Sequence, residues 1–168
     1  MVFSKDLAIE YNIQVGAIEN MLRRHSKANN VLIADEGPKG FLRIYDGFIE
    51  ALSELKEHLD CFAPTPEWLL ANKSTSAPIT INGCVYFLFS GENLVYIGQT
   101  RSLLGRLCAH QKQKSFDSIT VVTDFKGLSM IDFETVMINK FNPQYNIVGA
   151  TDGLNHLILL LKLVNYVE

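Results

Sequence analysis

The sequence has few cysteines, and they do not form a Cys-x-x-Cys pair. The three residues, Cys61, Cys84 and Cys108, are an odd number at wide spacing, a pattern that fits neither a disulfide framework nor a zinc site. We therefore expect free thiols and a reducing compartment. The amino terminus also lacks the long apolar run of a secretory signal, so we expect a cytoplasmic protein.

Long hydrophobic runs and an excess of positive charge are absent as well. The longest apolar run, Leu157 to Leu161, is too short to cross a bilayer, so no membrane span is expected. The net charge of -3 counts against a sequence-blind nucleic-acid coat. It leaves open an enzyme whose basic groups gather on one face. At 168 residues and 48% hydrophobic content, the chain can form one ordinary domain or two small ones.

Two apolar-periodic segments at the amino terminus predict a pair of short helices. Ser4 is a good N-cap for the first helix, and Asn12 suits the turn because asparagine tolerates a left-handed backbone. The pair resembles the helix-turn-helix of DNA-binding proteins, and the alternative is a plain helical hairpin. In the DNA-binding interpretation the second helix presents outward Gln14, Ala17, Glu19, Asn20, Arg23 and Arg24.

The next segments predict a hairpin and a longer helix. Residues 29–34 and 41–44 would pair as strands across a wing, and residues 45–59 form an amphipathic helix. We therefore expect an α+β chain in three parts: a mainly helical, winged-helix-like DNA-binding domain at 1–72, a linker at 73–82 and a second domain at 83–168.

The sequence of the second domain predicts a small antiparallel sheet flanked by helices. The expected strands are 84–90, 94–97 and 118–122, and the expected helices are 102–111 and 128–141. Pro143 stops the second of these helices. The apolar segment 154–164 is either a docking helix or a subunit contact, which makes a homodimer one expected assembly.

Polar residues in the two helices of this domain lie beside apolar stripes. With Leu103 set to zero, Arg106 falls at about 300° and His110 at about 340° on the helix. Glu134 lies between Ile131 and the pair Ile138 and Phe141, so its carboxylate is expected to point toward the apolar face. A buried carboxylate is costly without a cation or several hydrogen bonds, so this position indicates a functional role.

These residues stand in an order that resembles the GIY-YIG nuclease superfamily over about residues 84–148. The matching features are Val85-Tyr86, Tyr96-Ile97-Gly98, Arg106, His110, Glu134 and Asn146. The resemblance implies a three-stranded antiparallel sheet flanked by helices and a metal-dependent hydrolase that cuts phosphodiester bonds. One departure concerns packing: Cys84 stands where the family often has glycine, and Val85 replaces isoleucine.

The resemblance also implies a role for each residue. Glu134 would be the protein ligand of Mg²⁺ or Mn²⁺, and Arg106 would bind the scissile phosphate. Tyr86 would orient or deprotonate the attacking water with help from His110. Tyr96 would position the phosphate or the water, and Asn146 would tether the nearby loop. Lysines near this site, including Lys112 and Lys114, would contact backbone phosphates.

The sequence therefore predicts a metal-dependent DNA endonuclease, with DNA preferred over RNA as the partner. A different interpretation is a catalytically inactive DNA-binding regulator that keeps the nuclease fold. Each residue also has a structural explanation, since strand tyrosines are ordinarily core aromatics and Glu134 could form a structural pair with Arg106.

Overall fold

The computed structural model describes residues 1–37, 40–76, 83–146 and 150–164. The chain is of the α+β class, as expected, and contains two three-stranded antiparallel sheets. It divides into two compact units, which we call unit 1 (Met1–Leu59 with Gly149–Glu168) and unit 2 (Asp60–Val148).

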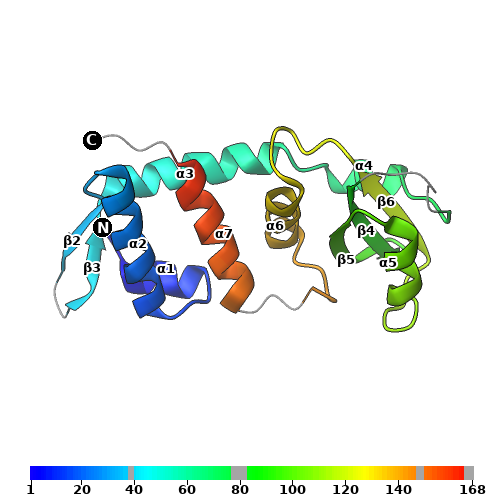
Figure 1. Ribbon diagram of the computed structural model, residues 1–168, viewed down its shortest axis with the longest axis horizontal. Coiled ribbons are helices and arrows are strands. Elements are labelled where there is room, and N and C mark those ends of the chain that lie inside the picture. The colour runs from blue at the N-terminus through cyan, green and yellow to red at the C-terminus, as the bar shows by residue number, and fades with distance from the viewer. Residues whose placement is uncertain (38–39, 77–82, 147–149, 165–168) are drawn as a thin grey trace. The chain divides into compact units, whose positions relative to one another are not determined.

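Within its described residues, unit 1 combines a small sheet with four helices, which Figure 1 shows. Its sheet has the order β1-β3-β2, and β3 pairs antiparallel with both neighbours. The elements are β1 (Val2–Phe3), α1 (Ser4–Glu10), α2 (Val15–Asn29), β2 (Ala34–Glu36), β3 (Leu42–Ile44), α3 (Asp46–Cys61) and α7 (Ala150–Leu163).

The turn between α1 and α2 is built on a left-handed asparagine, as the sequence predicted. Asn12 has a φ of 53°, and the next amide, that of Ile13, donates to the Ala8 carbonyl at 2.9 Å. A second left-handed residue, Asn30 with a φ of 55°, ends α2. The strand expected from residue 29 was therefore placed too early, because the helix continues to Asn29 and β2 begins at Ala34.

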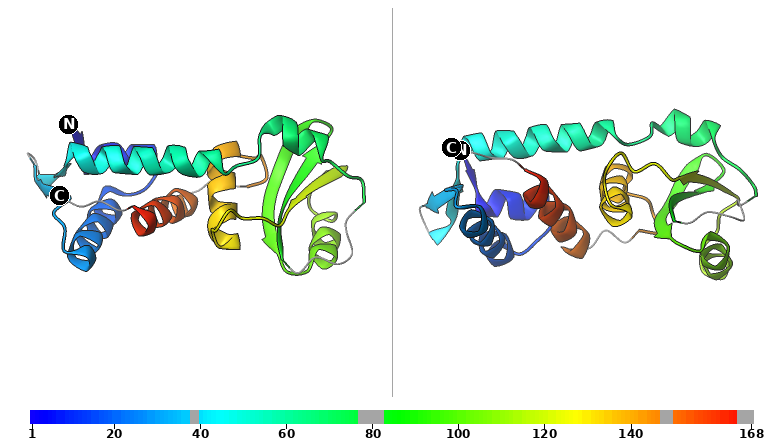
Figure 2. Two further views of the ribbon diagram at one scale, coloured as in Figure 1. Left: turned by 90° about the horizontal axis from the view of Figure 1, so that it is seen from above. Right: turned by 45° about the horizontal axis from the view of Figure 1, so that its top comes forward.

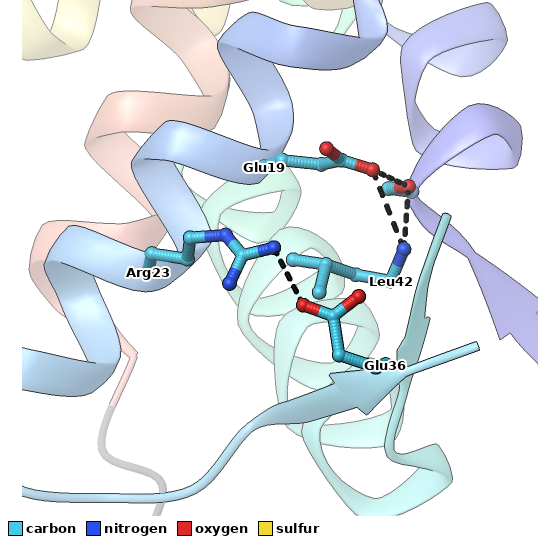
Figure 3. Close-up of polar contacts among 5 residues, drawn as sticks. Glu19, Arg23, Glu36 and Leu42 are labelled. Atoms are coloured by element: carbon cyan, nitrogen blue, oxygen red, sulfur yellow. Dashed lines mark hydrogen bonds and ion pairs between the residues drawn. The ribbon is translucent and has the colours of Figure 1, made fainter. Parts of the chain in front are cut away.

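The carboxylate of Glu19 joins α1, α2 and β3 (Figure 3). The expected positions of Ser4 and Glu19 were both wrong. Ser4 is the first residue of α1 rather than its N-cap, which is Phe3. The Ser4 hydroxyl instead donates to Glu19 Oε1 at 2.8 Å. The Leu42 amide lies 3.2 Å from Ser4 Oγ and 3.3 Å from Glu19 Oε1. Glu19 therefore faces the sheet rather than outward, because a buried amide and hydroxyl require an acceptor.

The C-terminal helix α7 belongs to unit 1. Its residues Leu157, Leu159, Leu160 and Leu161 are buried, and the His156 ring lies 5.8 Å from the ring of Tyr11 on α1. Of the two explanations offered for this segment, the contacts support a docking helix within the chain. Within the described ranges, no helix has the length and apolar character needed to cross a membrane.

Unit 2 contains the second sheet, with the order β5-β4-β6. The central strand β4 is almost entirely buried, which agrees with its run of apolar and aromatic residues. The elements are α4 (Pro66–Ala71), β4 (Cys84–Ser90), β5 (Asn93–Thr100), α5 (Leu103–His110), β6 (Ser118–Val122) and α6 (Met130–Phe141).

The two faces of this sheet are covered by different helices (Figure 2). Tyr86 on β4 packs in one buried cluster with Leu103 and Leu107 of α5. The neighbouring residue Phe87 points to the opposite face, where its ring lies 6.2 Å from the ring of Phe141 on α6. Helices α5 and α6 therefore flank the sheet from opposite sides.

The units differ from the expected domains at two places. Residues 60–72 lie in unit 2, because α4 docks on the sheet: the Thr120 hydroxyl donates to the Leu69 carbonyl at 2.7 Å. Residues 149–168, expected in the second domain, belong to unit 1. In the expected linker, Ser74 forms a bridge to Ile119 of β6, and residues 77–82 lie outside the described residues.

Candidate active site

Two tyrosines approach each other across β4 and β5 because the residue between them is glycine. The antiparallel register places Tyr86 opposite Gly98, and the rings of Tyr86 and Tyr96 lie 6.1 Å apart. A Cβ added at Gly98 would lie 2.5 Å from the Tyr86 hydroxyl and 2.7 Å from Tyr96 Cε1. The position therefore excludes a side chain, since such distances are far below van der Waals contact.

His110, the last residue of α5, binds the Tyr86 hydroxyl. Its Nε2 atom lies 2.8 Å from that oxygen, and its ring lies 4.7 Å from the ring of Tyr96. Burial, followed by the charges of Lys114 and Arg106, lowers the pKa of His110 to about 4. The imidazole is therefore neutral at pH 7, and a neutral Nε2 can accept the proton of the Tyr86 hydroxyl.

The Tyr86 phenol is held in its protonated form. Its side chain is completely buried, and burial, followed by the proximity of Tyr96, raises its pKa well above the usual value. Interaction with Arg106 opposes this shift. Tyr86 thus acts as a hydrogen-bonding hydroxyl at neutral pH, and forming a phenolate would require additional positive charge.

Arg106 lies one turn before His110 on α5. The buried face of α5 consists of Leu103, Leu107 and His110, so Arg106 is exposed at the side of this face. Its interactions with Tyr86, and to a smaller extent with Tyr96, raise its pKa. An exposed guanidinium close enough to a buried hydroxyl to influence its pKa can bind an anion from solvent on its exposed side.

Asn146 clamps the outer edge of β5. Its Oδ1 atom accepts from the Ile97 amide at 2.8 Å, and its Nδ2 atom donates to the Ile97 carbonyl at 2.9 Å. The preceding amide, that of Tyr145, donates to the Val95 carbonyl at 2.8 Å. Asn146 thus tethers the segment after α6 beside the tyrosine pair, which is the place that the sequence assigned to it.

Cys84 is accommodated within the core of unit 2. It is completely buried in the cluster that contains Tyr86 and Leu103, and burial raises the pKa of its thiol to about 11. Cys84 thus behaves as a small apolar residue here, and its thiolate is not available as a nucleophile at neutral pH.

Glu134 comes from the other side of the sheet. It is half-buried on α6, whose buried residues are Phe133, Val136 and Met137. The expected apolar stripe is wrong in one respect, because Ile131 is 62% exposed. The helix turns Phe133 and Met137 toward the sheet, so Glu134 stands beside the buried face instead of at its centre. On the face of the sheet covered by α5, the contacts described above connect Tyr86, Tyr96, Arg106 and His110, and Asn146 binds the strand that carries Tyr96.

The side chains of unit 2 fit a metal ion only with help from other oxygen ligands. Within the described residues, there is no group of three or more His, Cys, Asp or Glu side chains that could hold an ion. Magnesium commonly binds through one or two carboxylates together with water and substrate phosphate. Glu134 can supply one such carboxylate.

Four of the six predicted DNA-contacting residues of unit 1 are exposed, whereas Ala17 is half-buried and Glu19 faces the sheet. Gln14, Asn20, Arg23 and Arg24 lie on or directly before α2. Arg23 donates to Glu36 Oε1 on β2 at 2.9 Å (Figure 3). Both partners of this pair are more than half exposed, so the pair contributes little to stability and can exchange for a phosphate contact.

The two predicted lysines lie in the loop after His110. Lys114 is half-buried, with its Nζ atom 4.7 Å from the centre of the Tyr96 ring, whereas Lys112 is exposed. The structure adds two neighbours that the sequence did not indicate, Phe116 and Tyr145. Gly98 was part of the motif named from the sequence, and its packing role follows the rule that a glycine inside a strand often marks a close approach.

Comparisons with protein-family models, with curated proteins and with solved structures found no match.

Proposed function

We propose that this protein is a metal-dependent DNA endonuclease in which unit 2 is a GIY-YIG-type domain that hydrolyses phosphodiester bonds. The observation that carries the proposal is the convergence of Tyr86, Tyr96, His110 and Arg106 at one side of the sheet. A hydroxyl, a neutral imidazole and a guanidinium supply the three elements of this chemistry: an oriented water, a proton acceptor and charge relief at phosphorus.

In this proposal Arg106 binds the scissile phosphate through its exposed side. The Tyr86 hydroxyl hydrogen-bonds the attacking water, and as the water loses a proton to the Tyr86 oxygen, the Tyr86 proton passes to His110 Nε2. The water oxygen bonds to phosphorus as the P–O bond to the leaving strand end breaks, and the leaving oxygen takes a proton from solvent. Tyr96 holds the His110 ring in place by its contact at 4.7 Å. Glu134 comes from the helix on the other face of the sheet, and in this proposal it would hold a divalent ion that the substrate phosphate also contacts; the ion would supply polarisation of the phosphate and of the water.

Substrate binding would make His110 a better base. The charges of Lys114 and Arg106 contribute to its low pKa, and a phosphate bound near these groups would offset that contribution. The pKa of His110 would then rise toward neutrality only when DNA is present, which favours proton transfer in the complex.

Unit 1 would locate the DNA as a winged-helix-like module. The supporting features are the α1–turn–α2 arrangement with its left-handed Asn12, the β2–β3 hairpin and the sheet order β1-β3-β2. Residues from α2 would enter the major groove, with Gln14 and Asn20 near base edges and Arg23 and Arg24 near phosphates.

A second candidate is a DNA-binding regulator without catalysis. One observation favours it: with a pKa of about 4, His110 is a weak base in the free protein. This candidate keeps DNA binding by unit 1 and assigns unit 2 a docking role.

Plasmid cleavage separates the two candidates. Supercoiled plasmid is incubated with the full chain and Mg²⁺ or Mn²⁺, and relaxed and linear products are measured. Wild type should nick or cut, whereas Glu134→Gln and Arg106→Lys should lose at least about 100-fold in rate, since each removes a group aimed at transition-state charge. The matched controls are Glu92→Gln and Arg101→Lys, which change exposed residues of the same unit. The nuclease proposal fails if wild type binds DNA but cuts no plasmid under any of these conditions.

A further inference from the structure

A surface pocket lies directly beside the tyrosine pair and is lined by both basic and aromatic residues. Its volume is about 590 Å³, and its lining comprises Gln111, Lys112, Gln113, Lys114, Ser115, Phe116 and Tyr145. The two aromatic residues are half-buried and pack against the cluster that contains Tyr86. The buried cluster thus holds one side of each ring in place, and the other side faces the pocket.

The backbone of this pocket is attached to the candidate active site at both ends. The amides of Gln113 and Lys114 donate to the His110 carbonyl at 2.9 and 2.8 Å. On the other side, the Tyr145 amide is bound to β5 and the adjacent Asn146 is clamped to Ile97. The pocket is therefore preorganised relative to His110 and Tyr96.

The lining matches the chemistry of one nucleotide. Lys112 and Lys114 can bind a phosphate, and the side-chain amides of Gln111 and Gln113 can hydrogen-bond the edge of a base. An aromatic ring can stack on the face of a base. A base in a duplex has its faces covered by its neighbours, so stacking on Tyr145 requires an unpaired base.

We infer that this pocket binds an unpaired nucleotide of a nucleic-acid strand next to the phosphodiester bond that unit 2 cleaves, with its base stacked on Tyr145 and its phosphate at Lys114. The inference rests on the proposed function for the position of the cleaved bond. It narrows the substrate class to strands with at least one unpaired base beside the cleavage position, such as single strands, flaps and the locally unwound segments of a supercoiled plasmid.

The test measures binding without cleavage. The full chain in EDTA is titrated into a short single-stranded DNA that carries one 2-aminopurine, whose fluorescence falls when it stacks on an aromatic ring. Wild type and Tyr145→Phe should quench the probe. Tyr145→Leu, which keeps an apolar side chain of similar reach, should abolish the quenching and weaken binding by about tenfold. Lys114→Gln should weaken binding and reduce the salt dependence of log Kd by about 0.7.

Controls separate this site from general charge effects and from the nuclease proposal. Lys162→Gln removes one exposed charge from α7 in unit 1 and should leave quenching unchanged. Thermal melting confirms that each variant is folded. Equal quenching by wild type and Tyr145→Leu would overturn the inference, as would displacement of the strand by an equal concentration of AMP, which would assign the pocket to free nucleotides.

The failures of the two proposals are distinguishable. A chain that never cuts plasmid but shows Tyr145-dependent quenching retains the nucleotide site and loses the nuclease proposal. A chain that cuts plasmid while Tyr145→Leu binds and quenches like wild type retains the nuclease proposal and loses the nucleotide site.

Discussion

Replacing Gly98 by alanine should disrupt the candidate active site by displacing the Tyr86 side chain. The added Cβ would lie 2.5 Å from the Tyr86 hydroxyl oxygen and 2.7 Å from its Cζ atom, whereas non-bonded carbon contacts are optimal at about 3.5–4.0 Å. The Tyr86 ring would have to move by about 1 Å. Because Tyr86 is completely buried on the central strand, this movement must take place inside the core and displace its packed neighbours.

The expected cost has two parts. Overpacking of a well-packed core costs about 1–3 kcal/mol. Displacement of Tyr86 also stretches its bond to His110, now 2.8 Å, and an unsatisfied buried polar group adds about 1–3 kcal/mol. We therefore expect Gly98→Ala to lower the free energy of unfolding of unit 2 by at least about 2 kcal/mol.

Urea denaturation followed by circular dichroism measures this loss in the full chain. The control is Gly105→Ala on α5, where the nearest atom to the added Cβ is Ser102 Oγ at 3.4 Å; alanine should be neutral or stabilising there because it favours helix. In the double variant Tyr86→Phe with Gly98→Ala, removal of the hydroxyl relieves the shortest contact, so the two losses should not add. If Gly98→Ala unfolds at the same urea concentration as Gly105→Ala, the packing argument is refuted.

Three further predictions concern other contacts. Acidification should destabilise unit 2. In the unfolded chain His110 gains its proton near its ordinary pKa of 6.5, whereas in the folded unit its pKa is about 4. The free energy of unfolding should therefore be highest above pH 6.5 and fall by at most about 3 kcal/mol between pH 6.5 and pH 4. Asn146→Ala should cost about 1–3 kcal/mol and accelerate hydrogen exchange of the Ile97 amide, which loses its acceptor. Glu36→Gln should raise the affinity of the full chain for duplex DNA several-fold by releasing Arg23, whereas Arg23→Gln should lower it.

Each of these predictions has a control and a contrary result. For the pH dependence, His110→Gln should flatten the slope between pH 6.5 and 4, and an unchanged slope would contradict the assignment to this histidine. For the clamp, Asn139→Ala changes another asparagine of unit 2, and equal exchange of the Ile97 amide in both variants would contradict a role for Asn146. For the DNA contact, Glu67→Gln removes an exposed carboxylate of unit 2; an equal gain in affinity would assign the effect to net charge alone.

Local patterns in the sequence were sufficient for most elements of unit 2. The strands Cys84–Ser90 and Ser118–Val122 have the predicted bounds, because apolar and β-branched runs end at turn residues such as Gly91. The spacing of Arg106 and His110 also predicted that both lie on one side of α5. These features depend on neighbours close in sequence, and their geometry follows from the helix and strand periods alone.

Contacts between distant segments could not be predicted in this way. Glu19 was expected to face outward because its own helix gives no reason for burial, and only the approach of Ser4 and Leu42 supplies its partners. Glu134 was expected at the centre of an apolar face, but the packing of α6 on the sheet selected Phe133 and Met137 instead.

The sequence by itself determined the α+β class, the left-handed turn at Asn12 and the order of polar residues along unit 2, because each depends on backbone preference or short-range periodicity. Only the tertiary structure decided that α7 joins unit 1, that Gly98 lies against the Tyr86 hydroxyl, and that Tyr145 and Lys114 share one pocket. The physical reason is that these contacts form when separate elements pack together and exclude water between them. The sequence of one strand or helix does not specify which other element it will pack against.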